Sequence, residues 1–382
     1  MTGSHHWEIV CRVVDNYGDA GVALRLARQL LSEHGQRVTL WIDDPAPLAR
    51  LATGFDPAAD RSALDGIVVR RGPVGASDRL PGDVVIDAFG AGLPDAWVDA
   101  MARADRPPVW IVLEYLTAEG WADDAHLRSS PEPRTGLQRT YWCPGFTSGT
   151  GGLLREAGLF ARRDAFRGDP ASRSAALAEV GVAVPARALV ALLFCYPTPA
   201  IQALLDAWAE GDAPLLALVP RGVAVDALDR WTGGNVPHPG APCARGSLTL
   251  ASIPFVPQAD FDRLLWACDF AVVRGEDSFV RAQWAAMPFA WHAYPQADGA
   301  HHAKAAAFLE RYLEGAPRAA ADAAARFTGA LNRGDGPALA AAWPAFDRAR
   351  PALAAHGRDW SDRLAGRPDL ASGLVEFALA RL

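Results

Sequence analysis

The sequence predicts an α/β protein with two doubly wound, Rossmann-like domains, and three observations support this fold class. The chain has 382 residues, 50% of them hydrophobic and 21% charged, a length suited to about two packed cores. Short apolar strand patterns alternate with helical patterns in two separate series, as in parallel sheets covered on both faces. A looser segment with several prolines and glycines separates the series. We therefore expect two domains of similar size facing each other across a cleft.

The first series begins with a strand, a loop and a helix. A strand pattern over residues 7–14 gives way to Asp15-Asn16-Tyr17-Gly18-Asp19, and apolar residues then recur at helical spacing from Val22 to Leu31. The alternation continues with strand patterns at residues 38–42, 67–70, 84–87 and 109–113 and a helical pattern at residues 94–103. These elements predict the first parallel sheet.

The second series follows the looser residues 119–152 and helical patterns at 153–163 and 171–180. We expect a boundary near residues 182–187, which gives a first domain of residues 1–182 and a second of residues 183–357. The alanine-rich tail is helical in pattern, and we expect a C-terminal helix over residues 358–382 to pack back on the first domain. The second domain contains strand patterns at 189–195, 215–219, 248–253 and 270–273, and helical patterns at 199–209, 260–266 and 277–285.

Composition excludes several classes of function. A formal net charge of −7, without a basic run interleaved with aromatics, disfavours nucleic acid as a partner. No secretory signal pattern and no apolar run of membrane-spanning length is found, which disfavours a membrane location. An odd number of cysteines without a C-x-x-C pair predicts neither a disulfide framework nor a zinc site, and we expect a reduced, cytoplasmic protein. The cysteines are Cys11, Cys143, Cys195, Cys243 and Cys268.

The stretch from Arg274 to Trp284 predicts a phosphate site. A short strand ends at a glycine turn, Gly275, and Asp277 or Ser278 can cap the helix that follows. The first N–H groups of that helix, together with Arg274, could hold a diphosphate. Glu276 and Asp277 would repel phosphate and would have to point at sugar hydroxyls or a cation. An ordinary capped turn with a surface arginine explains the same residues.

Asp15 and Asp19 bracket a glycine-containing loop at the carboxyl end of the first strand, where open α/β sheets bind ligands. Asp19 could be the N-cap of a helix that begins at Ala20. A second acid four residues earlier gains nothing from capping. Two carboxylates at this range can instead grip a planar guanidinium or accept a proton from a nucleophile.

Aromatic residues also follow two strands of the second domain. Phe194 and Tyr196 lie at the end of the strand at 189–195, and Phe255 and Gln258 follow the strand at 248–253. Such rings can stack on a nucleobase, but aromatic residues at these positions are more often part of the core, because buried strands are rich in them.

Other motifs are weak or missing. The sequence contains no phosphate-binding P-loop, and Gly90-Ala91-Gly92 lacks the third glycine of a dinucleotide fingerprint. The adjacent His301 and His302 cannot both face one metal from a helix, and we expect them to be solvated.

Taken together, these residues resemble the family of bacterial elongation factor P arginine rhamnosyltransferases, and the resemblance runs nearly from end to end. Five motifs carry it. They are Val14-Asp15-Asn16-Tyr17-Gly18-Asp19 with Leu24-Arg25-Leu26-Ala27-Arg28-Gln29-Leu30, Leu113-Glu114-Tyr115-Leu116, Gly151-Gly152-Leu153-Leu154-Arg155-Glu156, Pro254-Phe255-Val256-Pro257-Gln258, and Arg274-Gly275-Glu276-Asp277-Ser278-Phe279-Val280-Arg281-Ala282-Gln283-Trp284.

The resemblance implies an inverting glycosyltransferase of GT-B architecture. Its donor would be dTDP-β-L-rhamnose, its acceptor an arginine of elongation factor P, and it would need neither a cofactor nor a metal. The first domain would bind the acceptor and the second the nucleotide sugar. One departure is His126-Leu127-Arg128-Ser129-Ser130, where the family tends to have His-Gly-Leu-Pro-Ser, so acceptor contacts there are left open.

Roles for individual residues also come from the resemblance. Asp19 would be the catalytic base and Asp15 would support it, while Glu276 would also be needed for activity. Asn16, Tyr17 and Gly18 would line the sugar site with Asp19. The residues expected around the dTDP group are Tyr196, Phe255, Gln258, Arg274, Asp277, Ser278 and Tyr294.

Two alternatives stay open at this point. The first is a nucleotide-sugar glycosyltransferase that acts on a small molecule or a lipid carrier. The second is a nucleotide-binding module without catalytic activity that regulates a partner. The Asp15 and Asp19 pair argues against the module, because binding alone does not need those acids.

Overall fold

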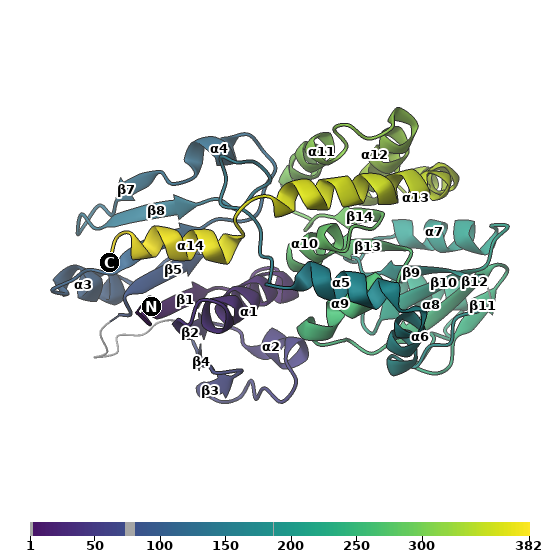
Figure 1. Cartoon of the computed structure of the whole chain (residues 1–382). Coiled ribbons are helices and arrows are strands. Elements are labelled where there is room, and N and C mark those ends of the chain that lie inside the picture. Colours follow the sequence, from purple (N-terminus) through teal and green to yellow (C-terminus); the bar gives the residue numbers. More distant parts are fainter. Residues whose placement is uncertain (1–2, 73–80, 186) are drawn as a thin grey trace. The chain divides into compact units, whose positions relative to one another are not determined.

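A computed structural model describes residues 3–72, 81–185 and 187–382. The chain divides into two compact units, which are each described by themselves (Figure 1). Unit 1 consists of Met1–Ala157 and Ala365–Leu382, and unit 2 of Gly158–Leu364. Each unit has a largely parallel sheet covered by helices, which confirms the predicted α/β class.

The sheet of unit 1 has the strand order β3-β4-β2-β1-β5-β6-β8-β7. Its central strand β1 pairs in parallel with β2 on one side and β5 on the other, while the edge strands β3 and β7 are antiparallel. The order therefore reverses between β1 and β5. The strands are β1 (His6–Cys11), β2 (Arg37–Ile42), β3 (Arg61–Leu64), β4 (Ile67–Arg71), β5 (Val84–Ala88), β6 (Val109–Leu113), β7 (Ser129–Pro131) and β8 (Gln138–Trp142).

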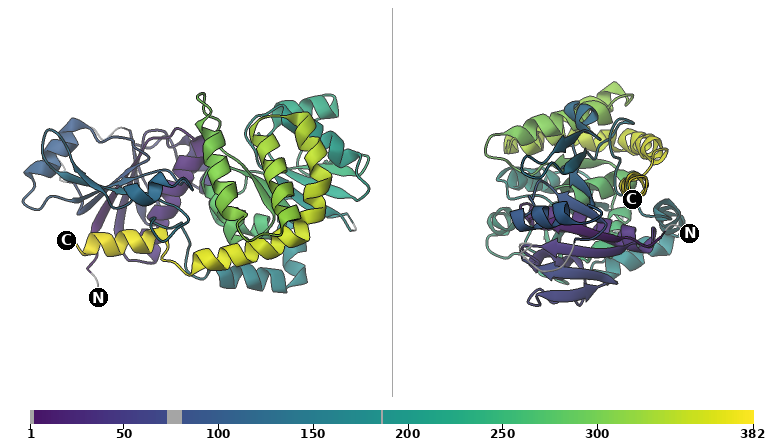
Figure 2. Two further views of the ribbon diagram at one scale, coloured as in Figure 1. Left: turned by 90° about the horizontal axis from the view of Figure 1, so that it is seen from above. Right: turned by 90° about the vertical axis from the view of Figure 1, so that its left-hand side faces the viewer.

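Helices pack on this sheet because most side chains of its central strands are apolar and nearly all of them are buried. One buried cluster joins Val10 of β1 and Val85 of β5 to Trp97 and Met101 of α3. Helix α1 contacts β1 and β2, and the last helix of the chain, α14, packs against α1 (Figure 2). Gln29 of α1 donates to Asp369 Oδ1 over 3.0 Å at that contact. The helices are α1 (Asn16–Ser32), α2 (Ala46–Leu51), α3 (Asp95–Arg103), α4 (Trp121–Ala125) and α14 (Leu370–Leu379).

The sheet of unit 2 has the order β11-β12-β10-β9-β13-β14, and it is parallel except for β11. Its order reverses between β9 and β13. The strands are β9 (Leu189–Leu193), β10 (Leu215–Pro220), β11 (Cys243–Arg245), β12 (Leu248–Ile253), β13 (Phe270–Arg274) and β14 (Phe289–His292).

The helices of unit 2 cover its sheet, with α11 to α13 on one side and α5, α6 and α9 on the other (Figures 1 and 2). None of the helices in the described part of the chain is long and apolar enough to cross a membrane. They are α5 (Leu159–Gly168), α6 (Pro170–Glu179), α7 (Ala200–Ala209), α8 (Val225–Thr232), α9 (Gln258–Trp266), α10 (Asp277–Trp284), α11 (Ala300–Tyr312), α12 (Arg318–Asn332) and α13 (Gly336–Ala365).

The structure corrects several expected boundaries. The helix expected at residues 153–163 begins only at Leu159, because Gly158 adopts a left-handed φ of 71° that ends the preceding loop. Helix α1 begins at Asn16, four residues before Ala20. The single helix expected over 358–382 is divided between α13 and α14, with Pro368 and the N-cap Asp369 between them.

The two units also differ from the expected domain ranges. Helices α5 and α6 contact α9, so residues 158–182 belong to unit 2 rather than to unit 1. The roles expected of the two domains, acceptor binding and nucleotide-sugar binding, stay predictions.

Candidate functional site

The predicted site residues divide between the two units. Asp15, Asn16, Tyr17, Gly18 and Asp19 lie in unit 1. The others, from Tyr196 to Tyr294, lie in unit 2. In unit 1 they follow the carboxyl end of β1, one of the two strands between which the strand order reverses. In unit 2 they follow the carboxyl ends of β9 and β13, where the order also reverses, and of β12 and β14 in the same sheet. Open α/β sheets bind ligands at the point where the order reverses.

In unit 1, Asp19 lies in the first turn of α1 and is only 2% exposed. Its Oδ2 atom accepts hydrogen bonds from the backbone N–H groups of Val14, over 2.7 Å, and Asp15, over 2.8 Å. The N-cap of α1 is Asp15, whose side chain makes no capping bond. Asp19 is therefore not an N-cap, because its carboxylate turns back and fixes the loop that follows β1.

The backbone of this loop is constrained around Asp15. Asn16 has a φ of 29°, a region that non-glycine residues seldom adopt and that asparagine tolerates better than most. The Gly18 N–H donates to the Asp15 carbonyl over 2.6 Å. A Cβ atom on Gly18 would lie 2.5 Å from Asp15 Oδ2. Glycine at position 18 therefore makes room for the Asp15 carboxylate beside Asp19.

A further acid at this edge of the sheet was not predicted. Asp87 lies near the end of β5, directly beside Val10 of β1, and is 5% exposed. The Gly92 N–H donates to its Oδ1 over 2.9 Å. The pKa of Asp87 is raised to about 6, mainly by burial and also by the charge of Glu114, although the Gly92 hydrogen bond acts in the opposite direction. Burial also raises the pKa of Glu114. Asp87 is the last residue of the strand pattern predicted at residues 84–87, and this position could have indicated a site residue.

In unit 2, Arg274 at the end of β13 is held against the end of β9. Its guanidinium lies 4.5 Å from the ring centroid of Phe194 and 4.9 Å from that of Tyr196. Its Nη1 donates to the Cys195 carbonyl over 3.2 Å. Cation–π contacts of this kind orient the guanidinium. Arg274 and Tyr196, predicted separately, therefore form one cluster.

Other predicted aromatics extend this cluster. The Tyr196 ring lies 5.4 Å from the Tyr294 ring, and Phe194 lies 6.2 Å from Phe255. Tyr294 is 40% exposed, whereas Phe194 and Tyr196 are buried. These distances fit both a packing role and a face for a nucleobase, so the stacking role stays a prediction.

The turn before α10 is built differently from the prediction. Gly275 has a φ of 59°, and Trp291 Nε1 donates to its carbonyl over 2.8 Å. The N-cap of α10 is Glu276, without a side-chain capping bond, so neither Asp277 nor Ser278 is the cap. The Ser278 hydroxyl accepts from the Arg274 N–H over 3.1 Å. This bond ties the helix start to the strand end.

The two acids of this turn have cationic or amide partners. Gln258 Nε2 donates to Asp277 Oδ2 over 2.9 Å, which joins two predicted residues from α9 and α10. Lys304 of α11, not predicted, donates from Nζ to Glu276 Oε1 over 3.2 Å. Both carboxylates are thus held in position by these bonds, and the expectation that they point away from a phosphate stays a prediction.

Of the adjacent histidines expected to be solvated, His302 is exposed but His301 is buried. His301 is 8% exposed, and its Nδ1 accepts from the Gln296 N–H over 3.1 Å, so it is not solvated. His292 lies 5.5 Å from Tyr196, and burial lowers its pKa to about 4, which keeps it neutral at physiological pH. Among the described residues no group of three histidines, cysteines or acids is arranged to hold a metal.

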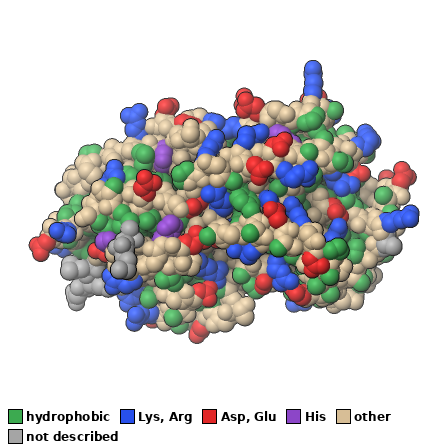
Figure 3. All heavy atoms as spheres, in the orientation of Figure 1, with side chains coloured by type: hydrophobic (Ala, Val, Ile, Leu, Met, Phe, Trp, Pro, Cys, Tyr) green, Lys and Arg blue, Asp and Glu red, His purple; other side chains and the backbone are tan. Residues whose placement is uncertain are grey.

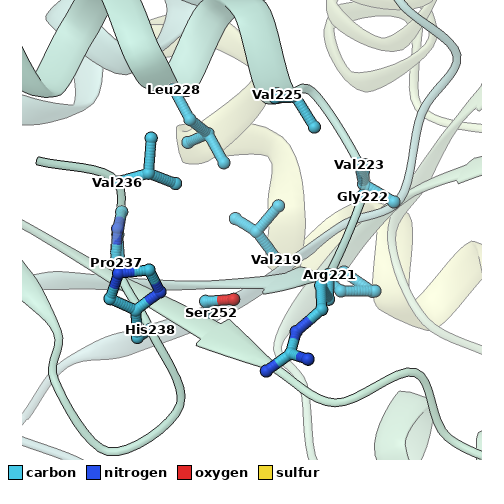
Figure 4. A pocket seen from close by; sticks show the side chains of 11 residues that line it. Val219, Arg221, Gly222, Val223, Val225, Leu228, Val236, Pro237, His238 and Ser252 are labelled. Carbon is cyan, nitrogen blue, oxygen red and sulfur yellow. The ribbon is translucent and has the colours of Figure 1, made fainter. Parts of the chain in front are cut away.

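A cavity of about 450 Å³ lies at the ends of β10 and β12 (Figure 4). Its walls are mainly apolar and include four valines, and the side chains of Arg221, His238 and Ser252 also line it. All its lining residues are described, and none is a predicted site residue. On the molecular face in Figure 3, acidic and basic side chains are interspersed.

Comparisons with known proteins agree with one another over nearly the whole chain. The family model of the elongation factor P (EF-P) rhamnosyltransferase EarP matches residues 7–379. A protein-arginine rhamnosyltransferase of Pseudomonas putida is 46% identical over 371 residues, covering 97% of this chain and 98% of the relative. A protein of the same name from Shewanella oneidensis is 37% identical over 388 residues, covering 98% of each chain.

Solved structures give the same result. The structure behind a study of EarP-mediated arginine glycosylation of translation elongation factor EF-P has a TM-score of 0.69 and 36% identity. It covers 99% of this chain and 100% of its own. MurG of Acinetobacter baumannii covers the same shares with a TM-score of 0.53 and 12% identity, which is a likeness of fold alone.

Proposed function

Because the chain belongs to the family of elongation factor P rhamnosyltransferases, and is thus an arginine rhamnosyltransferase with a GT-B fold, we propose the details of its reaction. The donor is dTDP-β-L-rhamnose, the acceptor is one arginine of elongation factor P, and the product is an α-linked rhamnosyl-arginine. The relatives' names support arginine as the acceptor, and the family description supports elongation factor P.

The observation that carries the proposal is the fixed carboxylate of Asp19 beside Asp15 at the carboxyl edge of the first sheet. An arginine guanidinium is a poor nucleophile because its pKa exceeds about 12 and its lone pairs are delocalised. A neighbouring carboxylate stabilises the cation further, so deprotonation before attack is disfavoured. A base that is already oriented can take the proton while the new bond forms.

The proposed step is one displacement at the anomeric carbon. A guanidinium nitrogen forms the C–N bond while the bond from the anomeric carbon to the phosphate oxygen breaks, which inverts that carbon. Asp15, Asp19 and Glu276 orient the guanidinium, and Asp19 accepts the proton. The leaving dTDP carries away the electron pair. No covalent intermediate on the enzyme is needed.

The donor site is proposed in unit 2. Arg274 and the first N–H groups of α10 would stabilise the charge on the leaving diphosphate without a metal. Asn16, Tyr17 and Gly18 would line the sugar, while Tyr196, Phe255, Gln258, Asp277, Ser278 and Tyr294 would surround the rest of dTDP. The contacts among these unit 2 residues support a common site. We place the reaction in the cytoplasm, where translation factors act.

Mass spectrometry of elongation factor P incubated with the purified enzyme and dTDP-rhamnose tests the proposal. We expect the mass of one deoxyhexosyl group on a single arginine, and NMR of the modified peptide should show an α linkage. Controls lack enzyme or donor. Donor consumption without modification of the factor would indicate another acceptor, and a β linkage would exclude the single displacement.

A further inference from the structure

Lys304 is the single lysine of this chain. All the other members of its 37 Lys and Arg residues are arginines. The exception lies on α11, where the ammonium group is 3.2 Å from Glu276 Oε1. Lys304 thus differs from every other Lys or Arg position, and it contacts a carboxylate that we propose to be catalytic. We therefore looked for a function that lysine can perform at this position and arginine cannot.

The contact between Lys304 and Glu276 is partly shielded from water. The Glu276 side chain is 13% exposed and the Lys304 side chain is 23% exposed. Glu276 occupies the N-cap position of α10 without a side-chain capping bond, so its carboxylate does not serve the helix end. A half-buried ion pair is screened less by solvent than a surface pair. The pair can therefore hold the carboxylate in one orientation.

The two helices that carry the pair are fixed to each other by aromatic packing. Phe279 lies three residues after Glu276 on α10, and Phe308 lies four residues after Lys304 on α11, so each ring is about one turn further along its helix. The two ring centroids are 4.5 Å apart, and both rings are almost fully buried. Trp291 of β14 stacks on Phe279 at 4.0 Å. This packing of aromatic rings fixes the positions of the two chain segments that carry Glu276 and Lys304.

We propose that Lys304 is a positioning residue that orients Glu276 for the acceptor arginine. The inference rests on the role proposed for Glu276 above. An ammonium group is a compact point charge, and that of Lys304 donates to Oε1 of Glu276. An arginine fork matches both oxygens of a carboxylate at once. An arginine at position 304 would therefore compete, as a second guanidinium, for the carboxylate that is meant to bind the acceptor's guanidinium.

Kinetics of three variants test the role. Lys304→Met should lower kcat by roughly 10- to 100-fold, as expected for a misplaced reacting group, with little change in donor KM. Lys304→Arg keeps the charge and should also lower kcat, because it occupies Glu276. Arg326→Met removes one exposed positive charge from α12 of the same unit and should leave kcat unchanged. Wild-type kcat in Lys304→Met overturns the proposal, and wild-type kcat in Lys304→Arg overturns the preference for lysine.

The contact itself can be measured without activity. Reductive methylation with ¹³C-formaldehyde labels two amines in the folded enzyme, the amino terminus and Lys304. We expect the dimethyl-Lys304 signal to differ from that of a free lysine and to move toward it in Glu276→Gln. A signal unaffected by Glu276→Gln overturns the ion pair. If Glu276→Gln itself retains full kcat, the role proposed for Glu276 fails, whatever the Lys304 signal shows.

Discussion

One carboxylate oxygen of Asp19, Oδ2, accepts hydrogen bonds from two backbone N–H groups. A substitution that keeps this oxygen can therefore remove the base without changing the orientation of the side chain. In Asp19→Asn the amide oxygen can accept the same two bonds, so the loop should keep its shape while the base is lost. We expect kcat to fall by roughly 10²–10⁴-fold. Calorimetry should give an almost unchanged dissociation constant for dTDP. Full turnover in this variant would remove Asp19 from the role of base.

A substitution of Gly18 tests whether the position of the Asp15 carboxylate matters for activity. A methyl group there would lie 2.5 Å from Asp15 Oδ2, too close for both to stay in place. Gly18→Ala should therefore displace the Asp15 carboxylate and lower kcat by at least about tenfold, since misplacement of about 1 Å is costly. The matched control is Gly120→Ala at the start of α4, where no atom lies within 4 Å of the added methyl group. Equal kcat values for the two variants would contradict this account of Asp15.

Asp87 links the site to stability. Burial raises its pKa from the ordinary 3.8 to about 6, so the folded chain binds this proton more tightly than the unfolded chain. Ionisation therefore lowers the free energy of unfolding as the pH rises from about 4 to 6. Asp87→Asn removes this loss and should be more stable than wild type at pH 7 by up to about 3 kcal/mol.

Urea unfolding of both proteins between pH 4 and 8 checks this effect. The advantage of Asp87→Asn should be small near pH 4, grow up to about pH 6 and then level off. Asp105→Asn replaces an exposed acid and should show no such dependence. A stability difference that does not change with pH would contradict the raised pKa.

At the scale of elements, the turn between β13 and α10 combines a strand end, a glycine and a helix start. Arg274 leaves this turn and rests on Phe194 and Tyr196. Arg274→Ala should weaken dTDP binding by roughly 10- to 100-fold, the loss of a charge-assisted hydrogen bond. Calorimetry measures this constant directly. An unchanged constant would show that the diphosphate binds elsewhere.

The sequence predicted several strands of the two sheets well, and β6 and β12 begin and end at the expected residues. It did not predict β14, because the four residues of Phe289–His292 are too few to show a period. Apolar spacing continued through Gly158, whose left-handed backbone nevertheless ends the preceding loop. Hydrophobic periodicity predicts which face of a helix or strand is buried, but it does not predict the backbone dihedral angles of a single residue.

In the candidate site, too, groups of residues close in sequence could be predicted, whereas contacts between residues distant in sequence could not. Asp15, Gly18 and Asp19 are close in sequence, and one strand-loop-helix pattern predicts their neighbourhood. The contact between Glu276 and Lys304 joins residues 28 positions apart on different helices. No spacing rule pairs them, because the packing of α10 against α11 brings them together. The composition nevertheless marks Lys304 as unusual.

At the scale of the whole molecule, unit 1 is discontinuous in sequence, since α14 returns to pack on α1. Leu370, Ala371 and Leu374 of α14 are buried, and Gln29 bonds to Asp369. A chain shortened to residues 1–364 should therefore lose stability in unit 1 and lose transferase activity. It should still bind dTDP, because the residues proposed around that group lie in unit 2.

Calorimetry with dTDP and thermal unfolding of this shortened chain check both parts of the prediction. We expect an earlier, separate unfolding transition for unit 1 and a nearly normal dissociation constant. Chain 1–379, which lacks only the last three residues after α14, is the control. Loss of dTDP binding together with unit 1 stability would show that the nucleotide site needs both units.

The return of α14 also sets an order of events on the ribosome. Unit 2 has all its residues once position 364 has emerged, whereas unit 1 begins first but lacks its last helix until residue 379 has emerged. Domains generally fold as units during synthesis. Until then, the side of α1 that α14 covers stays exposed to solvent. Nascent chains stalled before residue 370 should therefore recruit chaperones more strongly than released chains.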